Sequence, residues 1–554
     1  MKSAPKLARE KVPNKETSQI ERKLLGHAGT SVGDETAHTM SLEHDPVSYN
    51  DAIARPDAKF WKRAMAEELE EFVRKELFTE VGKPKDRHVV GCKWIFKRKL
   101  GPDGQVERYK ACLVAQGFSQ VEGIDYNETY APVTRHGTIR TLLALAARHQ
   151  WHIHQMDAKA AFLNGNLSEE IYMKASPGSN TCDGFVWRLN HALYGLKQAS
   201  REWYKKVRIE LESLGFTRSM SDHGVFIKND NGTLVIVAVY VDDFLIFSSK
   251  LNTIQHTKSE LSSRFDMKDL GDAKWILQME VTQSDDRKKV TLSQSQYIED
   301  ILERHGMANC HPVKTPMESG LSFPVLTEPE VDVTIYQQLI GSLMYAMVCT
   351  RPDISYAVGI VACHIAAPGH IHMKAVKRIY RYLCGISDYK LVYHATKGPN
   401  EPVIYLDSDW ASDRNDRKSI TGFVTCLSDG AITWASRKQT CVATSSTEAE
   451  FIAAATGCQE VLWLRNFLDS IQISITSPTV LYSDNQSAIN LITTGNINDR
   501  SKHIDTKYRF ICDRHESGCI STSYIPTNKQ PADGFTKLLS SVKFPAFVGH
   551  LGLM

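Results

Sequence analysis

A pair of adjacent aspartates between two strongly apolar runs is the feature that most constrains the fold of this chain. In TLVIVAVYVDDFLIFSS, the residues on both sides of Asp242 and Asp243 are mostly β-branched or aromatic, which is typical of buried strands. A carboxylate in such surroundings is costly unless it is paired, hydrogen-bonded or bound to a metal. An ordinary hairpin turn is the alternative interpretation. Type I′ hairpins, however, prefer Asn-Gly or Asp-Gly, whereas Phe244 follows here.

A third acid stands in a similar position elsewhere in the chain. The segment WHIHQMD predicts a strand that ends at Asp157. Strands with acids at their ends can bring three carboxylates together on hard divalent cations such as Mg²⁺. Two such cations, about 3.5–4 Å apart, would activate a hydroxyl group and stabilise a leaving pyrophosphate.

A second set of acids lies in the C-terminal quarter of the chain. From Pro402 onward the pattern predicts the order β-β-β-α-β-α-β-α, which is that of an α/β domain. Capping or surface acids are the alternative interpretation for each member taken alone. The four acids stand at the end of VIYLD, in the helix after SSTEAE, at the end of TVLYSD and at the start of a helix in QPADGFTK, and they are Asp407, Glu450, Asp484 and Asp533.

Composition excludes several classes of protein. The longest apolar stretches, Leu234 to Val241 and Leu339 to Cys349, are far shorter than the roughly 18–20 residues of a transmembrane helix. The N-terminal residues have no apolar core, so we expect no secretory signal. Twelve scattered cysteines without a CxxC pair argue against a disulfide framework or a zinc finger. With 554 residues, the chain is long enough for about three or four domains.

The charge balance conceals a basic patch. The chain has 66 basic and 64 acidic side chains, and this net charge of +2, taken alone, argues against a nucleic-acid partner, whose binding depends on phosphate charge. Between Lys83 and Lys110, however, nine Lys or Arg stand against three Asp or Glu. A basic groove together with two acidic metal sites would give a net charge close to zero.

An ordered set of motifs identifies the chain as resembling the reverse transcriptase of copia-type LTR retrotransposons. The matching segments are WIFKRK, RYKACLVAQGFSQVEGIDYNETYAPV, QMDAKAAFLNG, LYGLKQASREWY, YVDDFLIF and TRPDISYAV. They occur in the family's order, and the resemblance runs from about residue 57 onward. YVDD alone would be a weak signal, but the full set is very specific.

The resemblance implies an α+β right-hand polymerase, with fingers, palm and thumb, followed by an α/β ribonuclease H-like domain. We therefore predict five segments: 1–56 as a flexible leader or linker, 57–320 as fingers and palm, 321–400 as a mainly helical thumb or connection, 401–540 as the ribonuclease H-like domain, and 541–554 as a C-terminal tail. No aspartic-protease DTG or DSG and no CCHC knuckle occurs. We therefore expect the C-terminal part of a retrotransposon polyprotein, or a separate gene derived from one.

The resemblance assigns roles to residues of the polymerase part. Asp157, Asp242 and Asp243 would be the metal ligands, and Phe162 would exclude the ribose 2′-hydroxyl of incoming nucleotides. The stretch from Phe265 to Val281 resembles the hairpin that positions the primer end. The residues that would contact triphosphate, template phosphates or the template–nucleotide pocket are Lys97, Arg98, Arg108, Lys110, Tyr194, Gly195 and Lys197. The alternative is a core position for Phe162 and a solvated surface position for Lys97, Arg98, Arg108 and Lys110.

The four C-terminal acids match the DEDD arrangement of ribonuclease H, which hydrolyses the RNA strand of RNA–DNA hybrids with two Mg²⁺ ions. Asp409 competes with Asp407, and we favour Asp407 because it directly ends the apolar run. Glu448 competes with Glu450, and we favour Glu450 because an apolar helical run follows it. His503 would help to position hybrid or product. The basic residues Lys374, Lys377, Arg378 and Arg381 are spaced as one helical face, which would grip the duplex or simply be solvated.

The function that this resemblance implies is RNA-directed DNA polymerase with ribonuclease H activity. The cofactor would be Mg²⁺, two ions in each site, with Mn²⁺ as the alternative. The partners would be RNA template, DNA primer, RNA–DNA hybrid and deoxynucleoside triphosphates, without a membrane. The expected compartment is the cytoplasm, inside virus-like particles, with the nucleus as the alternative.

Three departures from the family pattern motivate a second hypothesis. Relatives read KARLV, LKQAP and FLGI where this chain has Cys112, Ser200 and Gln278. A decayed or co-opted copy that binds nucleic acid without synthesis would carry such changes. A third hypothesis is a protein whose only working chemistry is nuclease cleavage.

Overall fold

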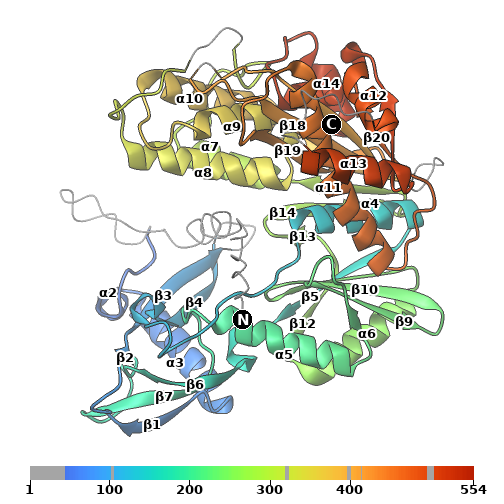
Figure 1. Cartoon of the computed structure of the whole chain (residues 1–554). Coiled ribbons are helices and arrows are strands. Elements are labelled where there is room, and N and C mark those ends of the chain that lie inside the picture. The colour runs from blue at the N-terminus through green and yellow to red at the C-terminus, as the bar shows by residue number, and fades with distance from the viewer. Residues whose placement is uncertain (1–43, 101–104, 319–322, 396–400, 414, 496–504) are drawn as a thin grey trace, which may run out of the picture. The chain divides into compact units, whose positions relative to one another are not determined.

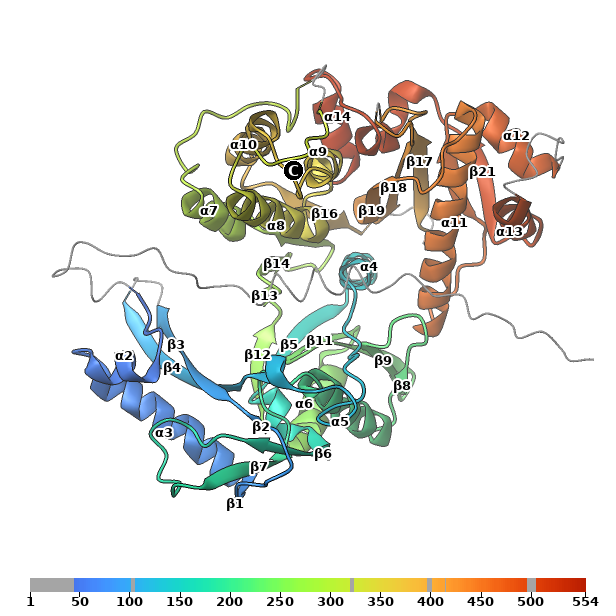
Figure 2. The ribbon, with the colours of Figure 1, turned by 60° about the vertical axis from the view of Figure 1, so that its left-hand side comes forward.

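The computed structural model describes residues 44–100, 105–318, 323–395, 401–413, 415–495 and 505–554. By its internal contacts, the chain divides into residues 1–45 and a second unit, residues 46–554, which holds all the elements below (Figures 1 and 2). Within the described ranges, no helix is long and apolar enough to cross a membrane.

Two helices open the second unit. α2 (Tyr49–Ala54) is capped by Ser48, whose Oγ accepts a hydrogen bond from the amide of Asp51, and it buries Ala52. The predicted leader, 1–56, therefore includes an ordered helix that is too short to show a periodic pattern in the sequence. α3 (Ala58–Arg74) follows and buries Trp61, Ala64, Met65 and Phe72, whose spacing places them on one helical face.

The next elements form two small sheets, the region predicted as fingers. β3 (Cys92–Leu100) and β4 (Val106–Ala115) pair with each other and form the basic hairpin, which carries Lys97, Arg98, Arg108 and Lys110. A four-stranded sheet has the order β1-β7-β6-β2. Its strands are β1 (Phe78–Gly82), β2 (Val89–Val90), β6 (Asn166–Met173) and β7 (Phe185–His191).

A six-stranded sheet of order β12-β5-β11-β10-β9-β8 carries the first acid set, in the position of a polymerase palm. The two apolar runs around Asp242 and Asp243 form the strands predicted for them, and these strands are antiparallel neighbours. The strands are β5 (His152–Ala158), β8 (Thr217–Arg218), β9 (Val225–Asp230), β10 (Thr233–Tyr240), β11 (Asp243–Ser248) and β12 (Met267–Asp272). The helices of this region are α4 (His136–His149), α5 (Ala199–Ser213) and α6 (Leu251–Arg264).

A helical region follows, together with a third sheet of order β13-β14-β15-β16. β16 (Lys390–His394) comes after the helices in the chain but pairs with β15, so it fixes the helical region to what precedes it. The other strands are β13 (Trp275–Ile276), β14 (Met279–Gln283) and β15 (Lys289–Ser293). The helices are α7 (Ser295–Arg304), α8 (Val333–Cys349), the 3₁₀ helix η3 (Pro352–Ile354), α9 (Ser355–Ala362) and α10 (His370–Cys384).

The C-terminal sheet has the order β19-β18-β17-β20-β21. β17–β18–β19 is an antiparallel meander, and β20 and β21 continue the sheet in parallel with β17, which is a ribonuclease H-like topology. The predicted fold class is thereby confirmed. The strands are β17 (Val403–Ser408), β18 (Ile420–Leu427), β19 (Gly430–Lys438), β20 (Thr479–Ser483) and β21 (Ile520–Tyr524). The helices are α11 (Ser446–Ser470), α12 (Gln486–Thr494), α13 (Asp505–Glu516) and α14 (Phe544–His550).

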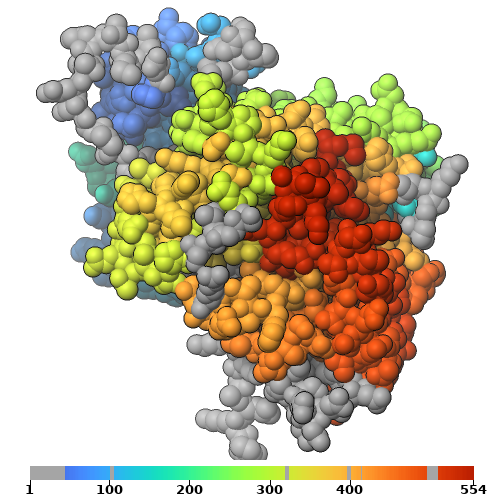
Figure 3. Space-filling view, turned by 90° about the horizontal axis from the view of Figure 1, so that it is seen from above, coloured from blue at the N-terminus to red at the C-terminus, as the bar shows by residue number. Residues whose placement is uncertain are grey.

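Two details of the C-terminal region differ from the sequence-based prediction. Among the described residues between β20 and β21 there are two α-helices rather than the one predicted. Asp533 lies in a short 3₁₀ helix, η6 (Pro531–Phe535), rather than at the start of an α-helix. The final residues are packed: the Lys390 amide donates to the Met554 carbonyl and the Met554 amide donates back. Figure 3 shows the red C-terminal part of the chain beside the yellow and orange parts.

Candidate active sites

The first acid set converges at one end of the six-stranded sheet. Asp157, at the end of β5, is directly opposite Asp243, the first residue of β11, in the antiparallel register. Asp242 lies in the turn that precedes β11, and its carbonyl accepts a hydrogen bond of 2.8 Å from the amide of Ala158. Since like charges opposite each other destabilise a strand pair, this register is costly without a cation.

The pKa values of these three aspartates are raised, as expected when like charges are brought together in a partly buried site. Burial raises the pKa of Asp157 and of Asp242, and the charge of Lys110 opposes the rise at both. Burial also raises the pKa of Asp243 to about 6, although Gln155 Nε2 donates a 2.8 Å hydrogen bond to its Oδ1. Burial thus makes the ionised form of all three carboxylates unfavourable in the absence of a cation. Their oxygens are a donor set suited to a hard divalent cation.

The turn before β11 is strained. Val241 has φ of 57°, in the left-handed region that a β-branched residue rarely adopts. Its carbonyl accepts a 2.6 Å hydrogen bond from the indole of Trp203, which holds the turn in place. Such strain is found where surrounding structure over-determines a functional loop. The turn is therefore a tight hairpin and an acid site at once.

The residues predicted to line a nucleotide pocket lie beside this site. The rings of Phe162 and Tyr194 are 4.6 Å apart, and the Asp242 charge reinforces the burial that raises the pKa of Tyr194. Gly195 has φ of 95°, and a Cβ on it would lie 2.1 Å from the Ala115 carbonyl oxygen, so only glycine fits there. Lys197 Nζ donates to the Tyr126 hydroxyl at 3.0 Å.

The basic hairpin presents its predicted residues on two different faces. Lys97 is opposite Lys110 and Arg108 is opposite Lys99, so these side chains share one exposed face. Arg98 is opposite Tyr109 and points to the other face, where Trp61 of α3 packs against Tyr109. Alternation with Trp94 and Phe96 in the sequence could have shown this difference beforehand.

The predicted basic face lies on α10. Lys374 and Lys377 are exposed there. Arg378 Nη1 is 2.6 Å from Glu318 Oε1, and Arg381 Nε donates to the His311 carbonyl at 2.7 Å, so the two arginines hold the segment before α8. A cavity of about 430 Å³ lies among these residues.

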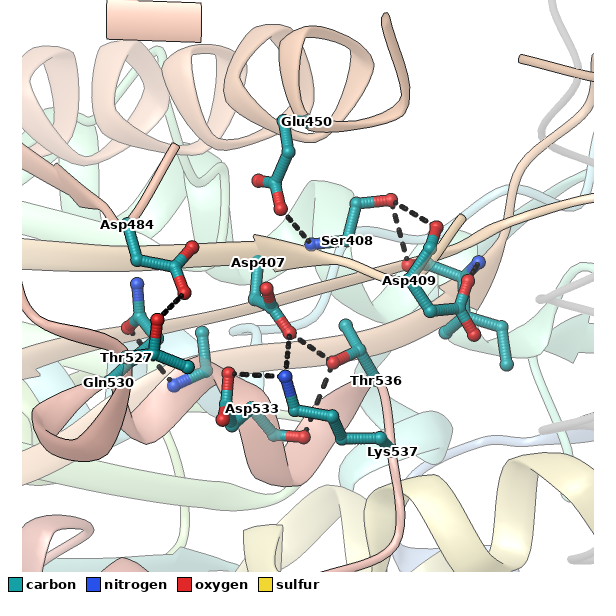
Figure 4. Close-up of polar contacts among 12 residues, drawn as sticks. Asp407, Ser408, Asp409, Glu450, Asp484, Thr527, Gln530, Asp533, Thr536 and Lys537 are labelled. Carbon is teal, nitrogen blue, oxygen red and sulfur yellow. Dashed lines mark hydrogen bonds and ion pairs between the residues drawn. The ribbon is translucent and has the colours of Figure 1, made fainter. Parts of the chain in front are cut away.

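The second acid set gathers around the end of β17 (Figure 4). Among the residues that the structure describes, Asp407, Asp484 and Asp533 are the one group of at least three possible metal ligands whose ligand atoms all lie within 4.8 Å of one another. Glu450 approaches from α11, and its Oε1 accepts a 3.3 Å hydrogen bond from the Ser408 amide. The Thr527 hydroxyl donates to Asp484 at 2.7 Å.

The burial of these acids makes a bound cation chemically fitting. Burial, together with the charges of Asp407 and Asp484, raises the pKa of Glu450 to about 9, and Oε2 of Glu450 is a buried oxygen without a hydrogen-bond partner. Burial and the Asp407 charge raise the pKa of Asp533 to about 6. An orphaned oxygen within an all-carboxylate set fits Mg²⁺ or Mn²⁺.

The competing acids have other partners. Asp409 accepts hydrogen bonds from the Ile420 amide and the Ser412 hydroxyl, which hold the loop after β17. Glu448 accepts from the amide and the hydroxyl of Thr444 at the start of α11, in the manner of a capping box. The geometry therefore favours the predicted Asp407 and Glu450. His503 lies outside the described residues.

Two residues at the second site were missed by sequence reasoning. The Thr536 hydroxyl donates to Asp407, and Lys537 Nζ lies 2.9 Å from Asp533 Oδ1 and 3.8 Å from Asp407 Oδ2. The four-residue spacing of Asp533 and Lys537 in QPADGFTK was the available signal.

Comparison with known proteins shows the family of the chain. A family model described as reverse transcriptase (RNA-dependent DNA polymerase) matches residues 75–319. The Retrovirus-related Pol polyprotein from transposon TNT 1-94 of Nicotiana tabacum is 40% identical over 517 residues, which are 91% of this chain and 39% of that polyprotein. The transposon Ty5-1 protein of Saccharomyces cerevisiae is 31% identical over its full length and 55% of this chain.

These matches define the family to which the chain belongs. The chain belongs to the reverse transcriptase family of copia-type retrotransposon Pol proteins. It spans about two fifths of the length of the tobacco polyprotein. Among solved structures, the foamy viral protease-reverse transcriptase in complex with RNA/DNA hybrid is similar over 84% of this chain and 54% of that one, with 12% identity and a TM-score of 0.46.

Proposed function

We propose that this chain is an RNA-directed DNA polymerase that extends a DNA primer on an RNA template. The observation that carries the proposal is the convergence of Asp157, Asp242 and Asp243 at one end of the six-stranded sheet. These acids would hold two Mg²⁺ ions. When bound, such a pair would activate the primer hydroxyl and neutralise the leaving pyrophosphate.

The residues around the acids would bind and orient the deoxynucleoside triphosphate. Phe162, packed on Tyr194, would close the pocket where a ribose 2′-hydroxyl would project. Lys110 is near enough to shift the pKa of two of the acids, so it would meet the triphosphate at the same place. Gly195 lets this loop approach β4 closely, and it thereby fixes the pocket to the basic hairpin.

Primer extension tests this proposal. The purified chain, with a labelled DNA primer on an RNA template and Mg²⁺, should extend the primer, and Asp242→Asn should lower the rate by about 10²–10³-fold or more. The exposed Asp285, in the turn between β14 and β15, offers a matched control: Asp285→Asn should leave the rate unchanged. No extension by the unaltered chain with either Mg²⁺ or Mn²⁺ would refute the proposal.

We also propose ribonuclease H activity, which the clustering of Asp407, Asp484 and Asp533 favours. Glu450 and these acids would hold the divalent cations, and Lys537 would keep a positive charge beside the scissile phosphate. The shared substrate would be an RNA–DNA hybrid, recognised through shape, phosphates and 2′-hydroxyls. Asp407→Asn should abolish removal of labelled RNA from a hybrid while primer extension persists. If extension were lost together with cleavage, the assignment of separate sites would be wrong.

The alternative of a decayed copy has a specific observation behind it. Leu277 and Gln278 both have positive φ, 49° and 57°, in the turn between β13 and β14, where the family pattern has a glycine at position 278. Cys112 lies beside Glu68, whose pKa burial raises to about 7, so the arginine of the family pattern would meet a buried acid there. Duplex binding without synthesis, with synthesis restored by Cys112→Arg, Ser200→Pro and Gln278→Gly together, would support this alternative. Robust extension by the unaltered chain would exclude it.

A further inference from the structure

The six-stranded sheet region and the C-terminal domain meet at α4. In Figures 1 and 2, α4 lies between the two regions, with β19 and α11 on its C-terminal-domain side. The approach is close: a Cβ on Gly137 of α4 would lie 2.8 Å from Thr433 Cγ2 of β19. One hydrophobic core runs through this junction and includes residues of α4, of α8–α10 and of β18, β19 and α11.

A single buried cation stands at the centre of the junction. Arg140 of α4 is 5% exposed. Its Nε donates to the Ile432 carbonyl of β19 at 2.6 Å. Its Nη1 donates to the carbonyls of Val348 and Cys349, the last residues of α8, at 2.7 and 2.8 Å. One guanidinium therefore bonds three elements that are far apart in the sequence.

Trp434 of β19 completes this arrangement. Its ring lies 3.9 Å from Arg140 Cζ, and its indole donates to the Met347 carbonyl at 3.1 Å. Three consecutive carbonyls at the C-terminal end of α8 thus receive donors from other elements. The final carbonyls of a helix lack partners within the helix and carry partial negative charge, so a buried cation is stabilised there. The charge of Glu460 in α11 also favours the charged form of Arg140.

The chemistry of this position requires arginine. A guanidinium offers five donors in a fixed plane and can bond carbonyls in two directions while it stacks on an indole. A lysine in its place would keep the charge but lose the plane and most of the directed bonds. Burial lowers the pKa of Arg140 to about 10, so the side chain stays charged at neutral pH.

We propose that Arg140 is a positioning residue that fixes the nuclease-like domain relative to the polymerase-like sheet, and thereby sets the distance along a hybrid between the primer end and the RNA cut. This inference rests on the proposed function. Because Arg140 bonds α4, α8 and β19 to one another across a junction that the shared core also holds, the end of β17 with Asp407 keeps a constant separation from the hairpin with Asp242. RNA would then be cut at a constant number of base pairs from the primer end.

The test measures the position of the cut in the RNA strand as the position of the primer end is changed. Full-length chain is given labelled RNA annealed to DNA primers that end at successive positions, each closed with a dideoxynucleotide and held with the next complementary nucleotide. The unaltered chain should give one dominant cut that moves by one nucleotide whenever the primer end does. Arg140→Met should spread the cut over neighbouring positions and lose this stepwise movement, while the total amount of RNA cleaved changes little.

Thermal unfolding supplies a readout that needs neither activity nor metal. Residues 46–554 of the unaltered chain should unfold in one transition, because the core is shared, and Arg140→Met should divide it into two. Val461→Ala is the matched control, since Val461 is buried in a core of the C-terminal domain alone. It should lower the unfolding temperature without dividing the transition, and the cut should still follow the primer end.

The outcomes separate this inference from the function on which it rests. If the unaltered chain neither extends nor cleaves, the proposed function fails. If it cleaves at positions that do not depend on the primer end, the positioning role is refuted. The role is also refuted if the cut made by Arg140→Met moves with the primer end as closely as the cut made by the unaltered chain. Should Arg140→Met not fold, Arg140→Lys and Trp434→Phe each remove part of the same contacts, and each should weaken the stepwise movement.

Discussion

A fully buried ion pair in the segment TRPDISYA allows one prediction to be worked out in detail. Arg351 is 0% exposed and Asp353 is 2% exposed. The guanidinium donates to both carboxylate oxygens, from Nε at 3.0 Å and from Nη2 at 2.6 Å. Arg351 Nη1 also donates to the Ile386 carbonyl at 3.1 Å, and the Tyr382 hydroxyl donates to Asp353 Oδ2 at 2.6 Å. The pair therefore joins η3 to the C-terminal end of α10.

The magnitude follows from what each substitution leaves behind. Asp353→Asn keeps the volume but leaves a buried guanidinium without its counter-charge, and breaking one partner of a buried pair costs about 3–5 kcal/mol. Tyr382→Phe removes one hydrogen bond to a charged group and should cost about 1.5–3 kcal/mol. Replacing both ions by apolar residues, as Arg351→Met with Asp353→Leu, should cost far less than Asp353→Asn alone, because no charge is then left buried.

Urea unfolding of the full chain, followed by far-ultraviolet circular dichroism, measures these free energies. The comparison of the single and the double replacement is decisive. A cost below about 1 kcal/mol for Asp353→Asn would show that the charge is not confined as the structure has it. A double replacement as destabilising as the single one would show that packing, rather than the unpaired charge, dominates.

Three further predictions concern single residues. Burial raises the pKa of Glu68 from 4.5 to about 7, so the folded chain holds a proton that the unfolded chain releases. The protonated Glu68 therefore contributes its full stability below about pH 4.5, and this contribution falls by up to about 3 kcal/mol as the pH rises to 7. Glu68→Gln should remove this fall when unfolding free energies are measured over a series of pH values. Parallel curves of free energy against pH for the two proteins would contradict the prediction. Gly195→Ala should cost at least about 3 kcal/mol, because φ is 95° and the new Cβ would lie 2.1 Å from a carbonyl oxygen. Gly184→Ala, with φ of 88° and nothing within 4 Å, should cost only the backbone strain, and equal losses in urea unfolding would deny the clash. Gln278→Gly should raise stability by about 0.5–1 kcal/mol by relieving the positive φ of Gln278, and no gain in the unfolding midpoint would refute this.

The acids of both sites could be found from the sequence because their signal is local. Asp242 and Asp407 each end or interrupt an apolar run, and a carboxylate in that setting needs a chemical reason. What could not be found locally is which strands pair. The register that puts Asp157 opposite Asp243 joins residues more than eighty positions apart, and the hydrophobic pattern of either strand alone fits several partners.

The supporting residues were missed for a related reason. Thr536 and Lys537 follow an expected helix start, but Pro531 and Gly534 produce a 3₁₀ turn that aims both side chains at Asp407. Gly534 is required there, since a Cβ would lie 2.4 Å from the ring of Phe547. That contact involves the C-terminal residues predicted as a tail, whose apolar side chains pack under η6.

Two arginines show where the boundary of sequence reasoning lies. Arg98 alternates with Trp94 and Phe96 on a strand, so its face could be derived from a period of two without any structure. Arg140 lies in HGTIRTLLALAARH, where a helical pattern also places it among apolar residues. A single cation on an apolar face, however, counts against the assignment of that face as buried. Its acceptors lie 208, 209 and 292 residues away. The role of a buried charge such as Arg140 can therefore be assigned only when the elements that accept its hydrogen bonds are known. In this chain those elements are α8 and β19, and the bonds join α4, in the region of the first acid set, to the sheet that carries the second.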